Sequence, residues 1–168
     1  MNMERELFEP PVAWSDPSIW AGLMVCPEGE AELWAYRHRR EADTFLRILR
    51  GRRCVTLDRC MGEIAAAFQL PYCTEPTWAS LRDNFPDGDF PPARHGILLI
   101  TSAHRILQRH PEDFASLTAI LADLSSGKLA CPSGPATWRI AFHTESRFRA
   151  PVQNRLDAAG VTWGRIAE

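Results

Sequence analysis

After residue 44 the spacing of apolar residues switches between strand-like and helix-like patterns. Phe45–Arg50 predicts a short strand that ends at Gly51. A helical stripe follows and ends before Pro71, because proline disfavours helical geometry in the residue that precedes it. The residues of this stripe are Leu57, Met61, Ile64, Ala65 and Phe68. The pattern therefore predicts a strand, a glycine turn and an amphipathic helix in succession.

A second, shorter helix is predicted to follow. Thr74 or Glu75 stands at its start, and Pro76 suits its first turn, where the missing N–H has no helical partner to lose. The apolar side of this helix consists of Trp78, Leu81 and Phe85. Asp83 lies on the other side at helical spacing, so we expect it to face solvent.

The second half of the chain repeats the alternation. His95–Thr101 is a continuous apolar run, typical of a strand covered on both faces in a parallel sheet. Pro111 opens a helix over 112–125, and another helix is predicted between Pro151 and Gly160. The strands are predicted at about 45–50, 96–101 and 138–143. We therefore expect an α/β fold with a small three-stranded parallel sheet flanked by helices.

The rest of the chain lies outside this unit. We interpret residues 1–43 as an N-terminal extension, 44–145 as the domain, and 146–168 as a C-terminal helix and tail. Two short apolar segments, Leu23–Cys26 and Ala31–Tyr36, predict a hairpin in the extension. The extension also contains Trp14, Trp20 and Trp34. Three exposed tryptophans would form a large apolar patch, so we expect the extension to pack on the domain.

Composition narrows the class of protein. The chain has 168 residues, of which 45% are hydrophobic and 24% charged, as in soluble globular domains. No signal peptide is visible in the acidic first residues, and the five cysteines have no regular spacing, which is typical of reduced thiols in the cytoplasm. Cys54 and Cys60 lack the spacing of zinc ligands, so we expect no metal and no cofactor.

Charge is unevenly distributed along the chain. Residues 37–60 contain eight arginines and three carboxylates, a block that would suit a phosphate backbone or simply form a solvated surface. Residues 75–90 are acidic instead, and would attract a cationic partner. The acidic residues of that segment are Glu75, Asp83, Asp87 and Asp89.

Several of these stretches, taken in order, resemble the barstar family of intracellular inhibitors of a secreted bacterial ribonuclease. Arg50-Gly51-Arg52, followed at the family's spacing by Leu70-Pro71, is similar to its first strand, turn and first helix. Cys73–Phe85 resembles the family's tyrosine-rich loop and short acidic helix. The resemblance covers about residues 44–145 and implies a non-enzymatic protein that binds a nuclease in the bacterial cytoplasm, as an immunity protein or antitoxin does.

The resemblance also implies where the partner binds: the loop and the second helix would plug a cationic active site with carboxylates. Asp83 falls on the family's principal carboxylate and Trp78 on its hydrophobic helix position, whereas Ala79 stands where a second carboxylate is expected. The implied partner-binding residues are Tyr72, Cys73, Thr74, Glu75, Trp78, Asp83 and Asp87. Because of the alanine at position 79, an alternative stays open: the protein is a barstar-like interaction module that does not inhibit a nuclease.

Two other functions compete with inhibition. The arginine block could bind RNA directly, although the acidic balance elsewhere makes a nucleic-acid partner the weaker interpretation. Cys73 with His104 or His143 could form a thiol–imidazole pair, but the chain contains no nucleophile elbow, phosphate loop or dinucleotide fingerprint. We therefore expect that the protein is not an enzyme or a membrane protein and that it has no small-molecule substrate.

Overall fold

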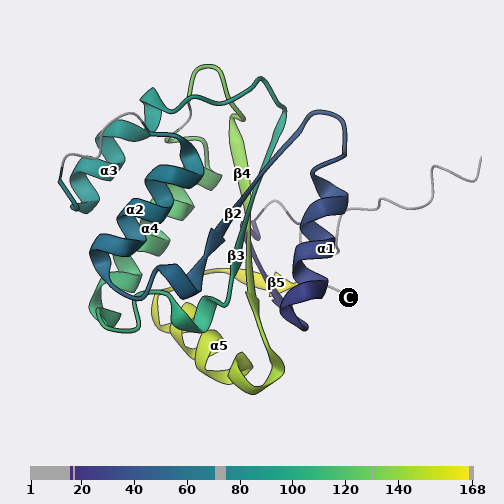
Figure 1. The fold of residues 1–168 in the computed structure, drawn as a ribbon, viewed down its shortest axis with the longest axis vertical. Coiled ribbons are helices and arrows are strands. Elements are labelled where there is room, and N and C mark those ends of the chain that lie inside the picture. The colour runs from purple at the N-terminus through teal and green to yellow at the C-terminus, as the bar shows by residue number, and fades with distance from the viewer. Residues whose placement is uncertain (1–15, 17, 71–74, 130, 167–168) are drawn as a thin grey trace, which may run out of the picture.

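The alternating strands and helices form one parallel sheet with helices on both faces (Figure 1). The computed structural model describes residues 16, 18–70, 75–129 and 131–166. Its strands are β1 (Ala21–Val25), β2 (Thr44–Arg50), β3 (His95–Thr101), β4 (Thr137–Thr144) and β5 (Trp163–Arg165). They are all parallel and lie in the order β2-β3-β4-β1-β5.

The longer helices cover the two faces unequally. The helices are α1 (Glu28–His38), α2 (Leu57–Phe68), α3 (Trp78–Asn84), α4 (Phe114–Ser125) and α5 (Arg149–Ala158). Helix α1 lies on one side of the sheet, and α2, α3 and α4 lie on the other (Figure 1). No helix in the described ranges combines the length and the apolar character needed to span a bilayer.

The larger core lies on the side of α2, α3 and α4. Trp138 of β4 is its largest fully buried side chain, and its ring contacts those of Phe45, Phe68 and Phe90 in edge-on geometry. Such arrangements match the positive ring edge to the negative ring face. Phe85, which follows α3, packs on Phe68 at a centroid distance of 4.8 Å. This aromatic cluster therefore fixes the end of α3 against the sheet.

A smaller core lies under α1. Ala31 and Ala35, one helical turn apart, are buried against Leu46, Leu99 and Ala141 on the other face of the sheet. Glutamates in the first turn of α1 and basic residues in its last turn also favour the helix, because they oppose its dipole.

The three strands predicted from the sequence are confirmed as β2, β3 and β4. The prediction of a three-stranded sheet is corrected, because the sheet has five strands. β1 lies between β4 and β5, so both ends of the chain contribute strands to the sheet. The predicted hairpin in residues 23–36 is wrong, because β1 and the helix α1 occupy that segment. Parallel strands need a crossover, and α1 is the crossover from β1 to β2.

The tryptophans of the N-terminal segment have different outcomes. Trp20 packs against the larger core and Trp34 against the smaller one, whereas Trp14 lies outside the described residues. The predicted start of the second helix is also corrected. Thr77, rather than Thr74 or Glu75, caps α3, and its Oγ1 accepts the N–H of Ser80 at 3.1 Å.

Candidate functional site

Helix α3 is held on the protein by its apolar side. Leu81 is fully buried and Phe85 is 1% exposed, so the helix has a fixed orientation relative to the core. Trp78 is half-buried and packs against the same core. These contacts leave the opposite side of α3 facing solvent, as the spacing of apolar residues predicts.

Two polar contacts connect α3 to the segment around α4. The indole Nε1 of Trp78 donates to Oδ1 of Asp113 at 2.8 Å, and Asp113 belongs to the turn η5 (Pro111–Asp113) that precedes α4. The guanidinium of Arg82 pairs with Asp123 of α4. Hydrogen bonding from Arg82 lowers the pKa of the Asp123 carboxyl, so this pair stays charged at neutral pH.

The predicted acidic residues lie on the exposed surface. Asp83 of α3, Asp87 of the turn η3 (Phe85–Asp87) and Glu75 before α3 are all exposed. Ala79, where the resemblance implies a second carboxylate, is exposed as well. Tyr72, Cys73 and Thr74 lie outside the described residues, so their place at the interface stays a prediction. We call the solvent-facing residues Glu75, Ala79, Asp83 and Asp87 the α3 surface.

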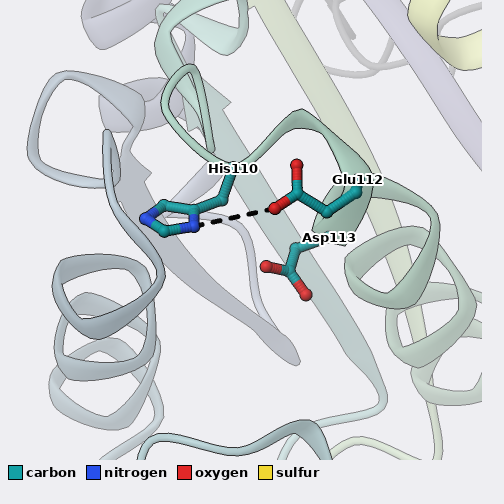
Figure 2. A group of neighbouring side chains, drawn as sticks. All are labelled: His110, Glu112 and Asp113. Atoms are coloured by element: carbon teal, nitrogen blue, oxygen red, sulfur yellow. Dashed lines mark ion pairs between the residues drawn. The ribbon is translucent and has the colours of Figure 1, made fainter.

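A second polar group lies at the start of α4 (Figure 2). It consists of His110, Glu112 and Asp113, whose ligand atoms lie within 4.8 Å of one another. Nδ1 of His110 is 3.8 Å from Oε1 of Glu112, and Asp113 already accepts from Trp78. Such a group could ligate a cation, although exposed acidic clusters are common without one. The sequence shows Glu112 and Asp113 only as first-turn residues of a helix, because the contact of Asp113 with Trp78 depends on tertiary structure.

The histidines of the thiol–imidazole hypothesis have other partners. The ring of His143 is fully buried, with Nδ1 accepting from the Ser102 N–H at 3.3 Å and Nε2 bonded to the Cys26 carbonyl at 2.9 Å. His104 stacks on Phe148, and burial lowers its pKa. Cys73 is outside the described residues. Both nitrogens of His143 are thus committed to backbone groups that join neighbouring strand ends.

The described cysteines are all buried: Cys26, Cys54, Cys60 and Cys131. A hydrogen bond with Cys60, together with burial, raises the pKa of the Cys54 thiol. A raised pKa disfavours the nucleophilic thiolate form. Cys54 therefore has the environment of a structural thiol.

Comparison with known proteins decides the family. The sequence model described as Barstar (barnase inhibitor) matches residues 44–129, about half of the chain. The chain belongs to the barstar family. The match runs from the start of β2 through α4 and includes the whole of α3. No curated protein matches the chain.

Solved structures with a similar fold include chains of low sequence identity to this one. A chain in a structure of Drosophila ORC bound to DNA is 11% identical, with a TM-score of 0.49 over 89% of this chain and 26% of that one. A chain in a structure of Drosophila ORC bound to GC-rich DNA and Cdc6 is 15% identical, with a TM-score of 0.48 over 88% of this chain and 25% of the other. This protein spans only about a quarter of each, and such likeness carries no conclusion about function.

Proposed function

We propose that this protein inhibits a ribonuclease by inserting the α3 surface into its active site. The observation that carries the proposal is the placement of Asp83. It is exposed on a helix that a buried leucine, an indole hydrogen bond and an ion pair hold in one orientation. Membership of a family described by barnase inhibition supports the same function.

The chemistry of the target explains why a rigid carboxylate suits it. A ribonuclease gathers cationic side chains around the phosphate that it cleaves, and a carboxylate can accept charge-assisted hydrogen bonds from them. Because α3 is held in place before binding, little conformational entropy is lost when the complex forms. Glu75 and Asp87 extend the negative potential on either side of Asp83 and would speed association. We propose inhibition, rather than catalysis, as the role of this surface.

The proposed setting is the cytoplasm of a bacterium, where the protein would act as an immunity protein or antitoxin. The buried free thiols of Cys54, Cys60 and Cys131 suit a reducing compartment and support this setting. The partner would then be a nuclease toxin that must be blocked before it leaves the cell.

A second candidate function is favoured by Ala79. This exposed methyl group stands where the resemblance implies a second carboxylate. Without that charge, the α3 surface would suit a less cationic protein partner than a ribonuclease active site. The protein would then be a barstar-like interaction module that does not inhibit a nuclease.

The experiment that separates the two is an RNA-cleavage assay with barnase and with any ribonuclease encoded beside this gene. We expect the protein to suppress one of these activities, and Asp83→Asn to weaken binding by about 2–5 kcal/mol, mainly through faster dissociation. Glu30→Gln, which removes an exposed carboxylate of α1, is the matched control and should leave the affinity unchanged. Tight binding by Asp83→Asn would exclude the active-site plug.

A further inference from the structure

A polar cavity of about 370 Å³ lies between the start of α1 and the turn that follows β2. It takes no residue from α3. Its lining residues are Glu28, Gly29, Glu32, Arg50, Arg52 and Arg53. The cavity lies at the carboxyl end of β2, the edge of a parallel sheet at which α/β proteins most often bind ligands.

The three arginines of the cavity differ in how they are neutralised. Arg52 pairs with Glu28, whereas Arg53 is 3.8 Å from Glu63 with most of its side chain in solvent. The guanidinium of Arg50 has no ion pair and no hydrogen bond with any described residue. Arg50 therefore presents a full set of free donors at the cavity.

Backbone contacts bring more arginines to the same edge. The N–H of Leu107 donates to the Cys54 carbonyl at 2.7 Å, and the N–H of Arg109 donates to the Val55 carbonyl at 3.1 Å. These bonds join the segment after β3 to the segment after β2. They bring the backbone of Arg109 beside Val55, two residues after Arg53, so exposed arginines from two distant parts of the sequence lie on neighbouring segments.

We propose that this cavity binds a phosphate group, carried either by a nucleotide or by an RNA strand. The planar guanidinium of arginine matches the oxygens of a phosphate and can donate to two of them at once. The guanidinium of Arg50 supplies a first pair of N–H donors. Arg52 supplies a second pair when the phosphate replaces Glu28 as its partner.

Two probes test the proposal and distinguish the sources of the phosphate. Inorganic pyrophosphate is titrated by calorimetry, and a short fluorescein-labelled oligouridylate by anisotropy, with the full chain in about 0.15 M salt to screen non-specific attraction. We expect saturable binding that Arg50→Ala weakens about tenfold, the usual effect of losing a hydrogen bond to a charged group. Glu28→Gln should strengthen binding severalfold, because it releases Arg52.

The control is Arg94→Ala. Arg94 is highly exposed but lies just before β3, at the amino end of the strands, and should change the affinity by less than about twofold. Arg50→Lys keeps the positive charge but loses the planar pair of donors, so its affinity should lie between those of the wild type and Arg50→Ala. Urea unfolding of each variant verifies that the fold is intact.

The outcomes separate clearly. Pyrophosphate binding that depends on Arg50 indicates a nucleotide-like ligand; binding of the oligouridylate alone, weakened by Arg50→Ala and by Arg109→Ala, indicates an RNA strand. Absence of saturable binding by both probes, or equal losses in Arg50→Ala and Arg94→Ala, would overturn the proposal. Nuclease inhibition through the α3 surface does not involve Arg50, so the two proposals can fail independently.

Discussion

At the scale of single residues, Gly51 shows how a local signal can have a tertiary cause. The sequence identifies it as the end of a strand. In the structure, a Cβ at this position would lie 2.4 Å from the carbonyl oxygen of Ser102 and 2.5 Å from that of Thr101. Both are backbone atoms at the end of β3, so they cannot move aside as a flexible side chain would. The reason for glycine is therefore the close approach of two strands that are distant in sequence.

Gly51→Ala is expected to destabilise the protein by about 1–3 kcal/mol or more, because the added methyl group overpacks the ends of β2 and β3. Gly62→Ala is the matched control: a Cβ there meets nothing within 4 Å, and the residue lies inside α2. Alanine at position 62 should raise stability by about 0.5–1 kcal/mol, since glycine is a poor helix former. Urea unfolding measures both, and a neutral Gly51→Ala would contradict the packing argument.

The sequence predicted the α3 surface only in part, because some of its features are local and others depend on tertiary contacts. Asp83 could be placed on the solvent side because its neighbours Leu81 and Phe85 have helical spacing, a local property. The hydrogen bond from Trp78 to Asp113 could not, because it depends on how α4 packs beside α3. The sequence therefore indicates which residues face a partner but not what holds them in place.

At the scale of elements, α3 depends on its neighbours. It has seven residues, far fewer than an isolated helix needs to be stable in water. Its stability comes from the Thr77 cap, the buried Leu81 and the contacts of Trp78 and Arg82 with the α4 segment. These contacts make α3 and α4 one structural unit.

A double-mutant cycle should detect this coupling. Trp78→Phe keeps an aromatic ring but removes the indole donor, and Asp113→Ala removes the acceptor. We expect each to destabilise the protein by about 1–2 kcal/mol, with a coupling free energy of about 1 kcal/mol between them. Urea unfolding of the wild type, both single variants and the double variant gives this value. Purely additive effects would show that the bond contributes nothing in solution.

The ion pair between Arg82 and Asp123 should make stability depend on pH. Its carboxyl has a pKa below the ordinary 3.8 in the folded protein, chiefly because it accepts a hydrogen bond from Arg82. The folded state thus binds fewer protons than the unfolded state, so the contribution is complete above pH 3.8 and disappears as the pH falls through the lower folded value.

Arg82→Ala should therefore reduce the free energy of unfolding at neutral pH by about 0.5–1 kcal/mol, the size expected for a partly exposed pair. The difference from wild type should shrink as the solution is acidified below pH 3.8. Arg94→Ala, which removes a more exposed pair with Asp43, serves as the control and should have little effect at any pH. A constant difference across the acid range would attribute the effect of Arg82 to packing instead.

At the scale of the whole molecule, the sheet unites segments that the sequence separates. β2, β3 and β4 were predictable because each is long enough to show a clear pattern. β5 has only three residues, too few to show a pattern. β1 is followed by α1, whose buried residues are alanines and whose large apolar residues, Leu33 and Tyr36, are exposed, so the sequence does not show an amphipathic helix there. The family match likewise begins at β2 and ends before β4. Neither local pattern nor family could place β1 in the interior of the sheet.

The position of β1 leads to a test of whether this strand is integral to the fold. Leu23, in the middle of β1, is 1% exposed and packs in the larger core with Leu98 of β3, which is fully buried. Leu23→Ala is therefore expected to destabilise the protein by about 2–5 kcal/mol, as Leu98→Ala should, because each leaves a cavity in the same core.

Leu33→Ala is the control from the same N-terminal segment. Its side chain on α1 is 50% exposed, so the change should alter stability by less than about 0.5 kcal/mol. Urea unfolding followed by tryptophan fluorescence measures all three variants. If β1 were an appendage on a domain that begins at residue 44, Leu23→Ala would leave the main transition unmoved while Leu98→Ala shifted it. A single transition that moves equally in both variants would instead show that β1 unfolds together with residues 44–129, the segment that matches the barstar family. The physical reason is that a central strand cannot leave a sheet without exposing the edges of both its neighbours.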